Sequence, residues 1–312
     1  MGYGLLRSFR KSSHKVRLIG TDIFHDAVGQ AWADTFVQAP LTSSENYLDW
    51  LEQTIKENKV DLLIPGIEQD VHCYTWQRAF FERIQTAVAL NRHELIVQTQ
   101  DKWLMDQELV RIQSPVRIPT VKEGSFAELV ELFGLPFILK PRRSYASKGF
   151  MRICSEKDFA PFKAKLGEEY IAQPQVGSDG EEYTVGAFGD GAGKVSALIA
   201  MRRTLGSDGA THKARIYKDA RLEDEIAELF RCLKPVGPTN LQFRRDENGW
   251  KLLEINPRIS SSSSIRTSFG YNEADMCLDF YHFNKEISQP AIRNGFAARF
   301  IEDYIVYDRD SF

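Results

Sequence analysis

Residues 252–264 read LLEINPRISSSSS, and this stretch decides how the rest of the chain is interpreted. Glu254, Asn256 and Arg258 alternate with apolar or ring residues. If the stretch is a β-strand, all three side chains point to the same face. An acid, an amide and a guanidinium on one face of an apolar strand need a physical reason, and the preceding residues supply one.

Those preceding residues predict a hairpin. Residues 239–258 read TNLQFRRDENGWKLLEINPR, two apolar strands joined by an Asp-Glu-Asn-Gly turn. The pairing turns Gln242 on the first strand toward Glu254 and Asn256 on the second. One carboxylate and two amide oxygens form a hard ligand set that suits Mg²⁺. Arg258 follows on that face, where a guanidinium holds a phosphate or carboxylate through two hydrogen bonds. The alternative is a surface strand with its polar residues facing outward.

A second candidate site ends the apolar stretch LPFILKP, residues 135–141. Lys140 closes this predicted buried strand, where a lysine is unusual unless it meets an anion. The next loop offers hydroxyls, an ammonium group and backbone amides to phosphate oxygens, from Ser144, Ser147, Lys148 and Gly149. The alternative is a solvated hairpin tip. Lys102, in QDKWLM, is by itself no more than a helix-surface lysine.

Composition narrows the class of protein. The 312 residues are 43% hydrophobic and 27% charged, with a net charge of −3, which predicts about two folded domains. The weakly acidic balance argues against a nucleic-acid partner. The four cysteines form no zinc or disulfide pattern and are interpreted as buried thiols in a reducing compartment. No apolar run approaches the ~20 residues of a membrane span, and no signal peptide is recognised. We expect a soluble, cytoplasmic protein without a membrane partner.

Residues 1–97 alternate predicted helices and strands, which indicates an open parallel sheet with helices on its faces. Ligands of such sheets gather at the carboxyl ends of the strands. Asp22 and Glu68 fall at two such ends and are candidate pocket residues, or else solvated loop acids. Because the chain starts at a Gly-Tyr-Gly turn, we expect this domain to be without its first strand.

Residues 115–175 predict a compact β-α-β-β-α-β unit. Within it, the helix SFAELVELFG ends at Gly134, a suitable C-cap. Further strands and an amphipathic helix follow. The polar stretch LGSDGATHKARIYKD, residues 205–219, is expected to be a mobile loop.

Together these residues resemble the ATP-grasp superfamily, and most of all its carbamoyl-phosphate-synthase-like carboxylate–amine ligases. LQF…LLEINPR carries most of the resemblance, and FILKP with its Ser/Gly loop carries the next largest part. The resemblance spans about residues 16–275. It implies an α/β chain whose ATP-grasp part is α+β. A Rossmann-like pre-ATP-grasp domain at 1–97 precedes a two-lobed ATP-grasp fold at 98–312, with a small lobe at about 115–175 and a large lobe at about 176–312.

The resemblance also implies roles for the candidate residues. Lys140 contacts the α-phosphate, Lys102 is the other nucleotide-binding lysine, and the 144–149 loop covers the triphosphate. The backbone around Gln173, Pro174, Gln175 and Val176 binds adenine, and Glu182 binds the ribose hydroxyls. Gln242, Glu254 and Asn256 match the magnesium ligands, and Arg258 faces the γ-phosphate and the acyl phosphate.

Arg202 and Arg203 end a predicted strand beside the 205–219 loop. We expect Arg203 to bind the acid or stabilise an acyl phosphate; the alternative is that these arginines face solvent.

The chain departs from the synthases in three respects. The synthases carry a further arginine where this chain has Ser261, and their duplicated subunit is far longer. The serine run, Ser260 to Ser264, stands where related ligases have a short Ser/Gly turn. We interpret it as a tight, hydroxyl-rich turn that holds a carboxylate, or alternatively as a flexible linker.

The expected activity is ligation of a small-molecule carboxylate to an amine by an acyl phosphate, with ATP and Mg²⁺ (or Mn²⁺) as cofactors and ADP as a product. The alternatives are a phosphotransferase that stops at the acyl or carbamoyl phosphate, and a non-catalytic ATP-binding module. Ligases of this kind often pair, so the resemblance is compatible with a homodimer, but the sequence does not fix the oligomeric state. The sequence names neither the acid nor the amine.

Overall fold

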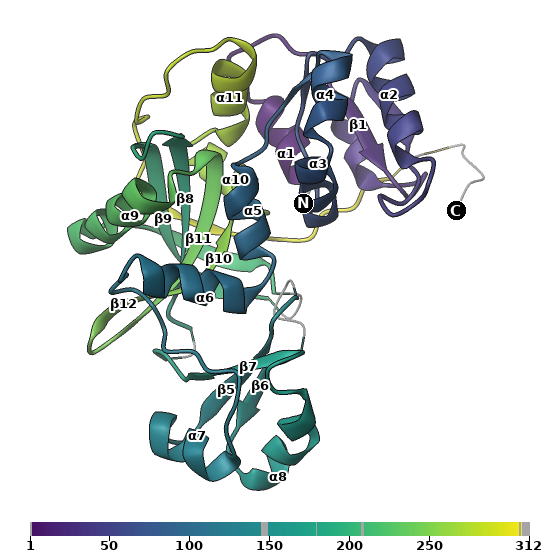
Figure 1. Ribbon diagram of the computed structural model, residues 1–312. Helices are drawn as coiled ribbons and strands as arrows, with labels where there is room; N and C mark the ends of the chain where they lie inside the picture. Colours follow the sequence, from purple (N-terminus) through teal and green to yellow (C-terminus); the bar gives the residue numbers. More distant parts are fainter. Residues whose placement is uncertain (1, 145–148, 179, 207–208, 306, 308–312) are drawn as a thin grey trace.

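The computed structural model describes residues 2–144, 149–178, 180–206, 209–305 and 307 of the chain. Figure 1 shows three parts: an N-terminal domain, a large antiparallel sheet with its helices, and a small lobe that stands apart below the sheet. None of the helices within the described ranges is both long and apolar enough to cross a membrane.

The N-terminal domain begins with a helix, and its strands pair in parallel. β1 pairs with β2, and β3 pairs with β4, as two separate two-stranded ribbons. The elements are α1 (Gly2–Phe9), β1 (Ile19–Asp22), the 3₁₀ helix η1 (Val28–Trp32), β2 (Thr35–Gln38), α2 (Tyr47–Asn58), β3 (Leu62–Leu63), α3 (Glu68–Trp76), α4 (Arg78–Ile84), β4 (Ala87–Val88) and α5 (His93–Thr99). The predicted alternation of helices and strands is confirmed, with strands shorter than the apolar runs of the sequence.

The small lobe is a three-stranded antiparallel sheet covered by helices on one side (Figure 1). Helix α6 (Lys102–Arg111) leads into it. The lobe contains α7 (Phe126–Phe133), β5 (Phe137–Pro141), β6 (Met151–Ile153), α8 (Glu156–Phe159), the 3₁₀ helix η2 (Ala160–Lys165) and β7 (Tyr170–Pro174). Ser125 and Glu128 form a capping box at the start of α7, and Gly134 ends that helix at φ 73° as predicted.

The large sheet has six strands in the order β12-β11-β8-β9-β10-β13, with antiparallel neighbours throughout. Its strands are β8 (Glu182–Asp190), β9 (Val195–Leu205), β10 (Thr211–Tyr217), β11 (Val236–Asp246), β12 (Gly249–Asn256) and β13 (Phe296–Ala298). The expectation of a mobile loop at 205–219 is wrong for residues 211–217, which form β10. Lys213 and Arg215 are exposed while Ala214 and Ile216 are buried, so the alternation that marks a half-buried strand was present from residue 213 onward.

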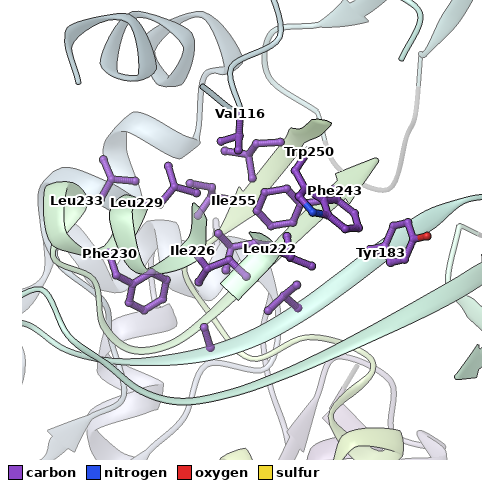
Figure 2. Close-up of a cluster of buried hydrophobic side chains, with 14 of the residues drawn as sticks. Val116, Tyr183, Leu222, Ile226, Leu229, Phe230, Leu233, Phe243, Trp250 and Ile255 are labelled. Atoms are coloured by element: carbon purple, nitrogen blue, oxygen red, sulfur yellow. The ribbon is translucent and has the colours of Figure 1, made fainter. Parts of the chain in front are cut away.

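Helices cover both faces of this sheet. On one face, α9 (Ala220–Leu233) buries an apolar stripe at helical spacing against the aromatic and aliphatic residues of β8, β11 and β12 (Figure 2). On the other face, a second core packs under α10 (Ser263–Ser268), α11 (Glu273–Cys277) and the π-helical turn η3 (Leu278–His282). Near the small lobe, that second face carries polar side chains, among them Glu182, Gln242 and Glu254, which line the candidate site described below.

The cysteines depart from expectation in one respect. All four are free thiols, but Cys277 alone of the four is buried, whereas Cys154 is exposed.

Candidate active site

A cavity of about 250 Å³ lies between the small lobe and the polar part of the large sheet. Residues predicted from separate segments of the sequence line it together. From the predicted set these are Lys102, Lys140, Gln173, Pro174, Gln175, Val176, Glu182, Gln242 and Glu254. Other lining residues include Ser144, Arg152 and Arg244. The cavity is therefore walled by two lysines, two carboxylates and several amides.

The two lysines approach the cavity from different elements. Lys140 is the penultimate residue of β5, and Lys102 opens α6. Burial lowers the pKa of Lys140 to about 8, although the nearby Glu254 carboxylate acts in the opposite direction. Burial likewise lowers the pKa of Lys102, with Glu254 and Glu68 opposing the shift. Cations held in a desolvated cavity gain more from an incoming anion than surface lysines do.

Within the described residues, neither lysine has a carboxylate at ion-pair distance. Lys102 Nζ donates to the carbonyl oxygen of Ser144 at 3.1 Å and to its hydroxyl at 3.3 Å. Asp101 fixes the start of α6 through its N-cap bond to the Trp103 amide at 2.9 Å. Arg142, just after β5, donates to the other oxygen of Asp101 at 2.8 Å. The two lysine-bearing elements are thus fixed to each other at one buried acid.

The structure describes part of the loop that follows β5. Ser144 lines the cavity, while Ser147 and Lys148 lie outside the described residues. Gly149 has φ +78°, and a Cβ there would lie 2.7 Å from Pro141 Cγ, so this position requires glycine. Its backbone returns directly beside the end of β5. The predicted contacts of Ser147, Lys148 and Gly149 with phosphate stay predictions.

The segment from β7 into the large lobe supplies two uncompensated acceptors. Gln173 Nε2 donates to Thr120 Oγ1 at 2.8 Å. The side-chain carbonyl oxygens of Gln173 and Gln175 are buried and accept no hydrogen bond from the described part of the protein. Buried acceptors of this kind carry a desolvation cost unless a ligand donates to them.

Glu182, the first residue of β8, is buried and held by arginines. Arg203 Nη2 and Nε donate to its Oε1 at 2.6 and 3.1 Å, because the two residues are directly opposite in the β8–β9 ladder. Arg244 Nη2 lies 3.7 Å from Glu182 Oε2. The arrangement fixes one carboxylate at the cavity wall. Arg203 therefore contacts an acid of the protein, and its predicted catalytic role stays a prediction.

The hairpin has the predicted geometry. Gln242 on β11 is directly opposite Glu254 on β12, and Asn256 follows two residues along the same face. Gln242 and Glu254 line the cavity, whereas Asn256 is buried deeper and its Oδ1 accepts from Arg258 at 3.4 Å. No cluster of three His, Cys, Asp or Glu side chains occurs among the described residues. The donor set is thus one carboxylate and two amide oxygens, whose chemistry fits Mg²⁺.

Arg258 reaches across to the N-terminal domain. Its Nη2 donates to Glu68 Oε2 at 3.0 Å, which joins residues 190 positions apart. Glu68 begins α3 just after β3, and His72 one turn later lies 3.8 Å from the other Glu68 oxygen. Burial lowers the pKa of His72, and the charge of Arg258 acts in the same direction. Of the two acids at predicted strand ends, Glu68 reaches the site, whereas Asp22 caps the Phe24 amide in an exposed turn.

The serine run is a buried structural turn. Ser260, Ser262 and Ser263 are buried, and Ser263 and Ser264 are the first two residues of α10. Ser262 Oγ lies 2.9 Å from Thr211 Oγ1, which in turn accepts from Arg203 Nη1 at 3.2 Å. The alternative of a flexible linker is wrong. The predicted tight, hydroxyl-rich turn is confirmed, and the hydroxyl groups tie it to β10.

Sequence reasoning missed three arginines near the site. Arg266 is fully buried on α10, where it pairs with Glu273 at 3.1 Å and donates to Asn240 at 2.6 Å. Arg244 follows Gln242 on the same strand face, so strand alternation was a usable signal for it. Arg299 contacts the Ser261 carbonyl from far along the chain, and no local pattern indicated this.

Comparison with known family models identifies two domains of the chain. Residues 176–304 match the family model described as ATP-grasp in the biosynthetic pathway with Ter operon. The chain carries an ATP-grasp domain. Residues 3–89 match the model of the PylC-like N-terminal domain. The predicted order, an N-terminal domain followed by the ATP-grasp fold, is confirmed.

Individual proteins give the same picture. The chain is 22% identical over 282 residues to the carbamoyl phosphate synthase large chain of Methanosarcina acetivorans, a match over 83% of this chain. The chain spans about a quarter of that relative's length, 26%. Among solved structures, N5-carboxyaminoimidazole synthetase from Staphylococcus aureus in complex with ADP has a TM-score of 0.71 at 19% identity, covering 93% of this chain and 77% of that one.

A biotin carboxylase from Campylobacter jejuni gives a TM-score of 0.73 at 16% identity, covering 95% of this chain and 72% of that one. At these identities the likeness concerns the fold.

Proposed function

We propose that this protein is an ATP- and Mg²⁺-dependent ligase that joins a small carboxylic acid to an amine through an acyl phosphate. One observation carries the proposal: Lys102, Lys140, Glu182, Gln242 and Glu254 come from separate elements and line one cavity. The cavity has cations for phosphates, a fixed carboxylate for hydroxyl groups and hard oxygens for a divalent ion. The likeness to a carbamoyl phosphate synthase and to an ADP-bound synthetase supports this assignment.

The nucleotide would lie between the lobes. Lys140 and Lys102 would bind the phosphate oxygens, since their ammonium groups are desolvated and lack acidic partners among the described residues. Glu182 would accept hydrogen bonds from the ribose hydroxyls, held in place by Arg203. The buried oxygens of Gln173 and Gln175 would accept from the N–H donors of the base.

Gln242, Glu254 and Asn256 would hold Mg²⁺, which when bound neutralises charge on the β- and γ-phosphates. The protein's own groups position the reactants for two steps. First, a carboxylate oxygen of the acid attacks the γ-phosphorus, the bond to the β–γ bridging oxygen breaks, and ADP leaves. Second, the amine nitrogen attacks the acyl carbon, phosphate leaves, and the nitrogen loses a proton.

The guanidinium of Arg258 would stabilise the charge on the transferred phosphoryl group in the first step. Glu68 holds that guanidinium where the N-terminal domain meets the large lobe. A position between the two lobes would limit the access of water to the acyl phosphate.

The first test is calorimetry of Mg·ATP binding. We expect Mg²⁺-dependent binding that weakens about a hundredfold in Lys140→Ala, since a charge-assisted contact to phosphate is lost from a desolvated site. Lys157→Ala removes an exposed lysine of the same lobe and serves as the matched control. Equal affinity in Lys140→Ala and wild type would contradict the proposed nucleotide site.

ADP release then separates the candidate activities. A ligase releases ADP with a panel of amino and hydroxy acids and forms an amide when an amine is added. A phosphotransferase releases ADP with the acid alone and forms no amide. A binding module binds Mg·ATP and releases no ADP with any acid.

A further inference from the structure

Two contacts hold Arg299, one to β10 and one to the serine run. It directly follows β13, the edge strand that pairs with β10, and its backbone N–H donates to the His212 carbonyl at 2.8 Å. Its side chain then turns inward, where Nη2 donates to the carbonyl oxygen of Ser261. The guanidinium is therefore part-buried and held at a fixed position.

Three other arginines close to the serine run or the cavity have acidic partners. Arg203 pairs with Glu182, Arg258 with Glu68 and Arg266 with Glu273. Arg299, in contrast, has no carboxylate within 4 Å in the part of the chain that the structure describes. A guanidinium has five N–H donors, and the Ser261 carbonyl engages one of its nitrogens. A part-buried arginine of this kind is suited to bind a carboxylate through two hydrogen bonds.

Its location is next to the proposed reaction centre. Ser261 stands three residues after Arg258, the proposed phosphoryl-binding arginine. Its neighbour Ser262 is hydrogen-bonded to Thr211, which in turn accepts a hydrogen bond from Arg203. Arg203 in turn donates to Glu182, which lines the cavity, so a short series of contacts connects the turn that holds Arg299 to the cavity wall.

We propose that Arg299 binds the carboxylate of the acid substrate, with the serine run as the adjoining wall. The assignment rests on the proposed ligase function and adds a residue and a substrate group to it. From the sequence alone, the serine turn itself was predicted to hold a carboxylate. Here that role is assigned to Arg299, whose side chain the turn positions. The group that Arg299 would bind is a carboxylate, and no residue is assigned to the amine.

A protection experiment on the wild-type protein tests the contact directly. Phenylglyoxal modifies arginines, and peptide mass spectrometry follows Arg299 and the exposed Arg293 separately. We expect acetate, glycolate or glycine to slow modification of Arg299 about fivefold or more, because the carboxylate occupies its donors. Arg293 should react at an unchanged rate, and acetamide should protect neither. Equal modification of Arg299 with and without every one of these acids would overturn the assignment.

Kinetics provide the second readout, with the panel acid that gives the fastest ADP release. We expect Arg299→Ala to raise the KM for the acid about tenfold or more and to leave the KM for ATP within about twofold. Arg299→Lys should recover part of the loss, and Arg293→Ala should behave as wild type. An unchanged KM for the acid in Arg299→Ala would also overturn the assignment.

The two proposals fail in different ways. If wild type binds no Mg·ATP, the proposed ligase function fails while the protection experiment still decides whether Arg299 binds carboxylates. If Mg·ATP binds and ADP is released but no acid protects Arg299, the contact proposed here fails alone.

Discussion

The two ends of the site handle positive charge in opposite ways. At the end between the lobes, Lys102 and Lys140 are desolvated and lack acidic partners among the described residues. At the end next to the serine run, Arg203 and Arg258 are each held by a carboxylate of the protein. A buried cation without an ion-pair partner favours binding of an anion, whereas a paired cation is oriented in advance and changes partner only when a stronger anion binds. The lysine end is therefore built for affinity and the arginine end for orientation.

The largest expected effect comes from removing the acid that lies near both lysines. Glu254→Ala takes away the carboxylate of the proposed metal site and leaves two buried ammonium groups with less compensation. We expect ADP release to fall about a hundredfold or more, because charge stabilisation at the phosphates is lost. The measurement is acid-dependent ADP release at saturating Mg·ATP.

Glu247→Ala is the control, because it removes an exposed carboxylate from the turn of the same hairpin. Thermal unfolding should show both variants folded. If the Glu254→Ala protein turns over ATP at the wild-type rate, the metal site has no part in the mechanism. The proposed role of the lysine end in binding Mg·ATP would then be contradicted as well.

The second effect is a pH dependence of binding at the lysine end. Burial lowers the pKa of Lys140 to about 8 in the free protein. Bound phosphate favours the ammonium form, so affinity is full below pH 8 and falls as the pH rises through 8. We expect the Kd of Mg·ATP to increase about tenfold between pH 7 and pH 9, with proton uptake on binding at pH 8. Calorimetry in buffers of different ionisation enthalpy measures both.

Lys140→Arg supplies the control, since arginine stays charged throughout this range. That variant should keep only the weaker dependence contributed by Lys102, whose pKa is also lowered by burial. A wild-type Kd that stays constant from pH 7 to pH 9 would show that Lys140 is not a desolvated phosphate contact.

The same contrast separates what the sequence predicts from what it does not. The lysine end is encoded locally: a lysine closing an apolar strand, and alternating Glu254 and Asn256 on a hairpin whose turn is explicit. These features follow from strand periodicity and turn chemistry, which act over a few residues. The hairpin geometry and the cavity residues Lys140, Gln242 and Glu254 were accordingly predictable from local patterns. Lys102, Glu182 and the segment 173–176 followed only from the family resemblance, and Arg244 was missed.

The arginine end depends on contacts between distant parts of the chain. Arg258 meets Glu68 across 190 residues, and Arg299 meets Ser261 across 38. Neither partner is fixed by local periodicity, because tertiary packing of the N-terminal domain and of the edge strand β13 brings them together. For the same reason residues 211–217 were expected to form a loop: their glycine-rich approach indicates a turn, while pairing with β9 and β13 makes them a strand.

The smallest effect distinguishes two adjacent arginines of β9. Arg202 and Arg203 point to opposite faces of the sheet, and each pairs with an acid: Arg202 with Glu181, both near half exposed, and Arg203 with the buried Glu182. We expect Arg203→Ala to raise the KM for ATP about fivefold with kcat within about twofold, since Glu182 loses the group that orients it toward the ribose. Arg202→Ala should change neither constant and should cost less than about 1 kcal/mol of unfolding free energy, as exposed pairs do.

Steady-state kinetics on the two variants, with urea unfolding of each, therefore decide what Arg203 does. A fall in kcat at unchanged KM would mean that Arg203 contacts the acid or the acyl phosphate directly, as its position at a strand end first indicated. The arginine end would then contain a catalytic group that leaves its carboxylate partner during turnover. A rise in KM alone would mean that its pairing with Glu182 is permanent, so that orientation of the ribose-binding acid is the whole of its contribution.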